Sequence, residues 1–223
     1  FVKYRDYAEA DWEEVLLKKE REGALQLSAE KLASLMLVRG NKGKMRMEEL
    51  PLKAQYAPIK GIIAHDLDGD GWEEVILTGN DFNKEVGNGP DAGLQGLVLS
   101  RAKEGSYGAV DAQRAGLSLR GDMRAMVRVF TEDGPAFLAS ENRGPLHLYR
   151  SSHTDKEALI FEALPLDNRA IQYFEDGRKK ALLFTYGSGY LGQSSRKMII
   201  PKDVMHMEVF DSSGKVRLIK YKE

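Results

Sequence analysis

An apolar hairpin that turns at an Asp-Gly pair occurs three times in this chain, and it constrains the fold more than any other feature. Asp-Gly between two apolar runs is a strong hairpin signal, because glycine adopts a positive φ at no steric cost. The three outgoing runs and their turns are 61–67 with Asp70-Gly71, 125–130 with Asp133-Gly134, and 171–174 with Asp176-Gly177. The chain is therefore expected to consist of repeated antiparallel strand pairs.

A second type of strand alternates with these hairpins. Leu35–Arg39, Leu97–Arg101 and Leu146–Arg150 share the pattern Leu-x-Leu-x-Arg, and 207–210 is a candidate fourth member. Units of about 45 to 60 residues with about four strands each are typical of propeller blades. We therefore predict a mainly β fold, a partial β-propeller of about three four-stranded antiparallel blades. A β-sandwich with accidental internal similarity is the alternative.

The first residues follow a different pattern. Trp12, Val15 and Leu16 recur at helical spacing within 8–21, with glutamates early and lysines late in the segment. Charges in this order complement a helix dipole. The sequence therefore predicts a short N-terminal amphipathic helix.

The composition excludes several classes of function. Lys and Arg number 33 against 34 Asp and Glu, so no basic excess indicates a nucleic-acid partner. No apolar run approaches the roughly 18 residues of a membrane helix, so direct membrane insertion is not expected. The chain has no cysteine, which excludes disulfides, thiolate metal sites and cysteine nucleophiles. No catalytic constellation stands out, and we expect a protein that is not an enzyme.

The turn of the first hairpin, DLDGDGWEE, is unusually acidic. Three aspartates occupy positions 1, 3 and 5, a glycine follows, and glutamate stands at position 9. Hard oxygen ligands at these spacings suit Ca²⁺, whereas unpaired carboxylates this close would repel one another. The predicted ligands are the side chains of Asp66, Asp68, Asp70 and Glu74 and the backbone carbonyl of Trp72. A solvated acidic turn is the alternative.

This nine-residue loop is not an EF-hand, because position 12 is Leu77 within an apolar strand. The equivalent turns at Asp133 and Asp176 lack the other carboxylates, so no metal is expected there. The loop 80–96 carries Asp81, Glu85 and Asp91, and it is open to two interpretations: a binding rim with a second cation site, or a flexible glycine-rich connection. Tyr186 and Tyr190 likewise suit either stacking on a sugar or peptide or packing at a blade edge.

The acidic turn resembles the calcium loop of FG-GAP/VCBS repeats, which form seven-bladed propellers. The family pattern ends in Asp where this chain has Glu74. The segment 187–196, GSGYLGQSSR, is similar to the G-x-GYLSQ segment of the ASPIC/UnbV module, with Gly192 in place of Ser. The resemblance implies the C-terminal portion of a large bacterial protein that is secreted or held at the outer-membrane surface.

These observations predict three segments: an N-terminal helical connection at 1–31, FG-GAP/VCBS-like blades at 32–165, and a C-terminal blade or ASPIC/UnbV-like module at 166–223. Three blades do not close a ring, so the expected partner is the rest of a larger propeller or another protein chain. The predicted function is a calcium-stabilised module that binds a protein, peptide or glycan at the cell surface, within nutrient-uptake or adhesion machinery as the resemblance implies. The alternatives are part of a polysaccharide lyase or hydrolase, and a structural scaffold.

Overall fold

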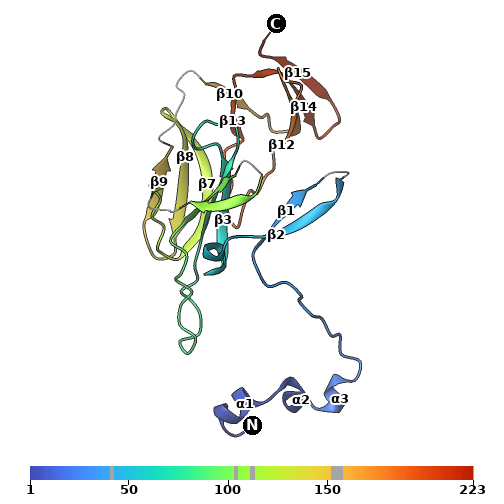
Figure 1. Ribbon diagram of the computed structural model, residues 1–223, viewed down its shortest axis with the longest axis vertical. Helices are drawn as coiled ribbons and strands as arrows, with labels where there is room; N and C mark the ends of the chain where they lie inside the picture. The colour runs from blue at the N-terminus through green and yellow to red at the C-terminus, as the bar shows by residue number, and fades with distance from the viewer. Residues whose placement is uncertain (41–42, 103–104, 111–113, 152–157, 223) are drawn as a thin grey trace. The chain divides into compact units, whose positions relative to one another are not determined.

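A computed structural model describes residues 1–40, 43–102, 105–110, 114–151 and 158–222. Its internal contacts divide the chain into two compact units, residues 1–33 and 34–223. Figure 1 shows short helices in the first unit and strands in the second.

The first unit does not contain the single helix predicted for 8–21. It forms three short helices, α1 (Tyr4–Glu9), α2 (Trp12–Val15) and α3 (Lys18–Arg21). Asp11 interrupts the helical path, because its side chain accepts hydrogen bonds from the N–H groups of Glu13 and Glu14 and so caps a new helix. None of the three helices buries a residue, so no packing favours a longer one. Among the described helices, none has the length and apolar character to span a membrane.

The second unit contains fifteen described strands and one 3₁₀ helix, η2 (Leu52–Gln55). The strands are β1 (Leu35–Arg39), β2 (Met45–Glu49), β3 (Ile59–His65), β4 (Glu74–Gly79), β5 (Leu97–Arg101), β6 (Tyr107–Val110), β7 (Met123–Thr131), β8 (Gly134–Glu141), β9 (Leu146–Arg150), β10 (Leu159–Glu162), β11 (Asp167–Phe174), β12 (Lys179–Leu183), β13 (Lys197–Ile200), β14 (Val204–Asp211) and β15 (Val216–Lys220).

The mainly β class with antiparallel sheets is confirmed. Strands β3-β4-β5-β6 form a four-stranded meander, and β7-β8-β9 form a second meander. The three predicted hairpins are present as β3–β4, β7–β8 and β11–β12. Their turn glycines all have positive φ, at 88° for Gly71, 109° for Gly134 and 84° for Gly177.

The C-terminal strands depart from the simple meander of a blade. Their sheet has the order β12-β11-β14-β15, whereas β13 pairs with β10 in a separate two-stranded sheet. The connection between β12 and β13, residues 184–196, carries β13 away from the sheet, so β14 returns beside β11. The second meander therefore has three described strands, because β10 pairs with β13 and not with β9.

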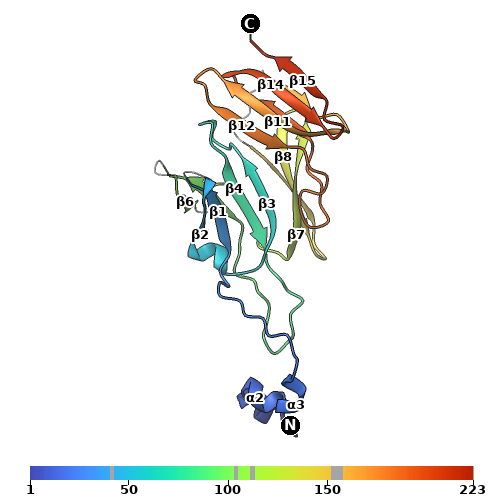
Figure 2. The same ribbon diagram turned by 90° about the vertical axis from the view of Figure 1, so that its right-hand side faces the viewer.

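The first two meanders pack on one another through β3 and β7 (Figure 2). Ile63 and Ile76 of the first sheet share a core with Met126 and Phe137 of the second. Gly61 makes the close approach possible, because a Cβ there would lie 2.8 Å from the Cβ of Met126. The C-terminal sheet buries its own cluster, which includes Phe161, Ala170, Phe174, Phe184, Ile200, Val204, Met207 and Val209.

Asn80 joins the end of β4 to the following sheet. Its side chain is fully buried, donates to the carbonyl oxygens of Leu94 (2.7 Å) and Gly121 (2.9 Å), and accepts from the N–H of Leu94 (2.9 Å). Asn142, at the corresponding place after β8, donates to Asp122 at 3.0 Å. An asparagine therefore follows both the β3–β4 and the β7–β8 hairpin, and in each case its side chain holds the start of the next connection in place.

Gly79 is expected to be indispensable for this arrangement. A Cβ there would lie 1.9 Å from the carbonyl oxygen of Pro58, which accepts the Asn80 N–H, so the backbone itself would have to move. Gly79→Ala should lower the free energy of unfolding by about 3 kcal/mol, measured by urea denaturation. Gly108→Ala in β6 is the control, because a Cβ there meets nothing within 4 Å. Equal stability of the two variants would contradict the close approach.

Candidate functional site

The turn between β3 and β4 is held by its own carboxylates. Asp66 accepts hydrogen bonds from the N–H groups of Gly69 (2.7 Å) and Gly71 (2.9 Å), and both glycines have positive φ. Asp68 accepts from the N–H of Asp70 at 3.2 Å. These bonds wind the backbone tightly and direct carboxylate oxygens toward the inside of the loop.

Three of the four predicted carboxylate ligands come together. Asp66, Asp68 and Glu74 each offer one oxygen, and these oxygens lie within 4.8 Å of one another. Glu74 is only 5% exposed, and its carboxylate accepts from the N–H of Leu67 at 2.9 Å and from the Ser100 hydroxyl at 3.5 Å. Among the described residues, no ion pair involves any of these three carboxylates. The group therefore has the oxygen donors, and the uncompensated charge, that suit a divalent cation.

The remaining predicted ligands have other contacts. Asp70 is exposed and accepts a hydrogen bond from the N–H of Trp72 at 2.8 Å. The Trp72 ring is half exposed and packs under the Arg101 guanidinium, 3.8 Å from its centroid. The roles of Asp70 and of the Trp72 carbonyl as ligands stay predictions.

Burial and charge act in the same direction on Glu74. Burial raises the pKa of its carboxyl, the nearby Asp68, Asp70 and Asp66 raise it further, and the hydrogen bond from Leu67 opposes them. Burial also lowers the pKa of His65 to about 4, with a smaller contribution from Arg128. The neutral His65 ring, at the end of β3, packs edge-on against the Phe137 ring, with 5.3 Å between the ring centroids. This contact is a packing role.

Acidic residues of two other loops are paired with cations. In the loop 80–96, Asp81 lies 3.6 Å from both Lys60 and Arg124, and Asp91 pairs with Lys84. At the third hairpin turn, Asp176 pairs with Arg178. Within the described ranges, the acidic group of the first turn is the one that could hold a metal ion.

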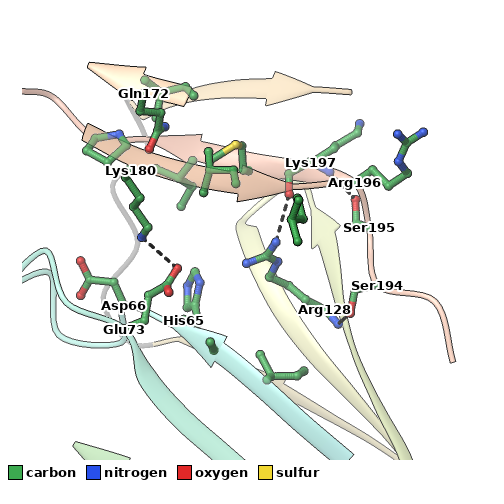
Figure 3. A pocket seen from close by; sticks show the side chains of 18 of the residues that line it. His65, Asp66, Glu73, Arg128, Gln172, Lys180, Ser194, Ser195, Arg196 and Lys197 are labelled. Carbon is green, nitrogen blue, oxygen red and sulfur yellow. Dashed lines mark hydrogen bonds and ion pairs between the residues drawn. The ribbon is translucent and has the colours of Figure 1, made fainter. Parts of the chain in front are cut away.

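A cavity of about 920 Å³ opens beside the acidic turn (Figure 3). The turn supplies one wall, β7 a second, and the C-terminal sheet with the segment 193–197 the others. The polar residues that Figure 3 labels in it are His65, Asp66, Glu73, Arg128, Gln172, Lys180, Ser194, Ser195, Arg196 and Lys197. Sequence reasoning missed this cavity, because its residues come from distant segments that share no motif.

Polar contacts of the cavity residues join two of its walls and support a third. Lys180 of β12 reaches Glu73 of the acidic turn at 3.1 Å, and Lys197 pairs with Glu162 at 3.2 Å. Arg196 donates to the carbonyls of Leu164 (3.0 Å) and Phe184 (3.4 Å), among other acceptors. The Lys180–Glu73 pair therefore connects the C-terminal sheet with the acidic turn, whereas the contacts of Lys197 and Arg196 lie within the C-terminal strands and their connections.

The segment 187–196 lies along β7. Ser195 donates its N–H to the Arg128 carbonyl at 2.7 Å, and the Arg128 N–H donates to the Ser194 hydroxyl at 3.0 Å. A Cβ at Gly192 would lie 3.0 Å from Val127, so a larger residue would crowd this contact. Tyr186 donates to the Pro165 carbonyl at 3.0 Å and lies under Arg196, a packing role.

No family model and no curated protein matches this chain. Among solved structures, it is similar to virginiamycin B lyase from Staphylococcus aureus, with 14% sequence identity and a TM-score of 0.20. The alignment covers 77% of this chain and 58% of that one, so the chain spans less than two thirds of that protein. A likeness this weak carries no argument, and the resemblance to FG-GAP/VCBS repeats stays a prediction.

Glu74→Gln is expected to stabilise the metal-free protein. Because the pKa of Glu74 is raised in the folded state, folding takes up a proton, and stability falls as pH rises from the ordinary glutamate range through the raised pKa. In the presence of a chelator at neutral pH, the variant should gain about 1 kcal/mol over the wild type. The gain should vanish in acid, where Glu74 is protonated. Thermal denaturation from acid to neutral pH measures both effects. A loss of stability in the variant at neutral pH would contradict the raised pKa of Glu74.

Proposed function

We propose that this chain is a calcium-stabilised binding module, not an enzyme, of a bacterial cell-surface protein. The observation that carries the proposal is the gathering of Asp66, Asp68 and Glu74 within 4.8 Å in a turn that also lines a cavity. Calcium suits such a site because it accepts several carboxylate and carbonyl oxygens in flexible geometry. Asp70 and the Trp72 carbonyl are the further ligands that the loop offers.

Calcium would act on the binding surface through the backbone of the turn. Residues 69–73 both carry the loop and line the cavity, and Glu73 holds Lys180 of the opposite wall. A cation that fixes the carboxylates therefore fixes the wall to which a ligand binds. Binding then needs less ordering of the loop, which favours affinity.

The exposed hairpin β1–β2 supports the proposed partner, the rest of a larger propeller or another chain. It is a sheet of two described strands, and such a pair is marginally stable by itself. Leu37 and Met47 pair across it and are 64% and 63% exposed on the same face. Further strands, or another blade, would cover this face. The resemblance to FG-GAP/VCBS repeats supports a location at the outer-membrane surface.

Calcium should raise the melting temperature of the purified protein after chelation. Millimolar Ca²⁺ is expected to add about 2 kcal/mol of stability, since a ligand that binds only the folded state stabilises it by mass action. Asp68→Ala should abolish this increase, because Asp68 is an exposed member of the carboxylate group. Calorimetric titration gives the affinity directly.

Asp133→Ala is the matched control, because Asp133 occupies the corresponding turn of the β7–β8 hairpin, outside the acidic group. It should leave the calcium response intact. No heat and no change in melting temperature with calcium would remove the metal from the proposal. Turnover of a polysaccharide, lost in Asp68→Ala, would favour the enzyme instead.

A further inference from the structure

Arg128 is a cationic group of the cavity that makes few contacts with the described residues. It lies on β7 and is half buried, and Figure 3 shows its guanidinium reaching into the space between the acidic turn and residue 197. Among the described residues its side chain makes one hydrogen bond, a long one of 3.4 Å from Nη2 to the Lys197 carbonyl oxygen. Within the part of the chain that the structure describes, its Nε has no hydrogen-bond partner and no carboxylate forms an ion pair with it. A guanidinium carries five N–H donors, so most of its capacity is unused.

Arg196, which lines the same cavity, makes many more hydrogen bonds than Arg128. Arg196 also has an Nε without a partner, yet its terminal nitrogens donate to the Tyr186 hydroxyl at 2.6 Å and to several backbone carbonyls. It also lies over the Tyr186 ring. Arg196 therefore has a structural role that accounts for its burial, whereas Arg128 has none of comparable extent.

Burial without a counter-ion has a measurable electrostatic consequence. Desolvation lowers the pKa of Arg128, and the only carboxylate that raises it is Glu73, which is already paired with Lys180. Three other basic side chains of the cavity have acidic partners: Lys180 pairs with Glu73, Lys197 with Glu162 and Arg178 with Asp203. Arg196 instead donates to backbone carbonyls and to the Tyr186 hydroxyl. A guanidinium whose N–H groups are mostly unused and that has no carboxylate partner among the described residues matches a carboxylate on a ligand.

A second donor in the cavity lacks a partner. Gln172 lies on the central strand β11, is 1% exposed, and its Nε2 makes no hydrogen bond to the described residues. It pairs in register with Lys180, so both side chains lie on the sheet face that borders the cavity. A buried amide donor without an acceptor is costly, and it is usually explained by a missing ligand or water.

The remaining lining groups indicate what else the ligand carries. The hydroxyls of Ser194 and Ser195 and the carboxylates of Asp66 and Glu73 offer both donors and acceptors, as a hydroxyl-rich molecule requires. Trp72 adds a half-exposed aromatic ring. The volume of about 920 Å³ falls within the roughly 300–1,000 Å³ of small-ligand sites, whereas an extended acidic peptide would need a long groove.

We propose that this cavity binds an acidic sugar, a hexuronate unit or short oligomer, whose carboxylate lies against the Arg128 guanidinium. Arginine suits this role because its planar group binds a carboxylate through two parallel hydrogen bonds. Gln172 and the two serines hydrogen-bond the sugar hydroxyls. The inference rests on the proposed function only in taking the chain as a binding module, and it requires no calcium in the acidic turn.

Trigalacturonate is the probe, titrated by calorimetry and by tryptophan fluorescence, both with calcium and with a chelator. Its methyl ester is the neutral control, and triglutamate tests an acidic peptide. Binding of trigalacturonate at millimolar concentration or below, with at least tenfold weaker binding of the ester, is expected. Equal binding of the ester, no binding of trigalacturonate, or tighter binding of triglutamate would overturn the proposal.

Arg128→Gln should weaken the binding of trigalacturonate at least tenfold without lowering the melting temperature, because it removes an uncompensated charge. Arg128→Lys keeps the charge but loses the two parallel hydrogen bonds, so its affinity for trigalacturonate should lie between those of the wild type and Arg128→Gln. The lysine variant also tests the proposal if the glutamine variant fails to fold. Arg169→Gln, an exposed arginine outside the cavity, should bind as the wild type does. Wild-type affinity in a folded Arg128 variant would overturn the assignment.

The two proposals fail separately. Binding of trigalacturonate that depends on Arg128, together with no calcium response, leaves the sugar site in place and removes the metal. A calcium response that depends on Asp68, with no binding of trigalacturonate, does the reverse. Each result therefore refers to one site.

Discussion

The buried carboxylate of Glu74 imposes the strongest constraint on this structure. It begins β4 at 5% exposure, with two aspartates near it and an N–H and a hydroxyl as its described donors. An ionised carboxylate in such a place must take up a proton, a cation or more donors. The tight winding of residues 66–71 brings the carboxylates of Asp66 and Asp68 close to that of Glu74. A bound cation would therefore reduce the repulsion between these negative charges.

Two neighbouring glutamates give this short segment two roles. Glu74 begins β4 and belongs to the acidic group, whereas Glu73, the residue before the strand, lines the cavity and pairs with Lys180. The same residues thus connect the acidic turn with the C-terminal sheet. The contact of Ser194 and Ser195 with the backbone of Arg128 makes a second connection, on the β7 side of the cavity.

Local signals predicted much of the fold. The Asp-Gly pairs at 70, 133 and 176 each mark a real hairpin, since a turn depends on the φ of one glycine and little else. The helix over 8–21 was wrong because Asp11 captures backbone donors that the periodic pattern of Trp12 and Val15 does not reveal. The order β12-β11-β14-β15 depends on where a long connection leads, and pairing between distant strands has no local signal. The spacing of Asp66 and Glu74 revealed the acidic group, whereas Arg128 and Gln172 meet at one cavity only through tertiary packing.

Proximity couples the two proposed sites electrostatically. Asp66 belongs to the acidic group and also lines the cavity, so its negative charge repels an acidic ligand held by Arg128. A divalent cation bound to Asp66 would neutralise that charge and reduce the repulsion. Because a coupling free energy is reciprocal, a bound acidic sugar would in turn strengthen the hold on the cation. The hairpin turn would then do more than stabilise the fold. It would make the affinity of the cavity for the acidic sugar depend on the calcium concentration around the protein.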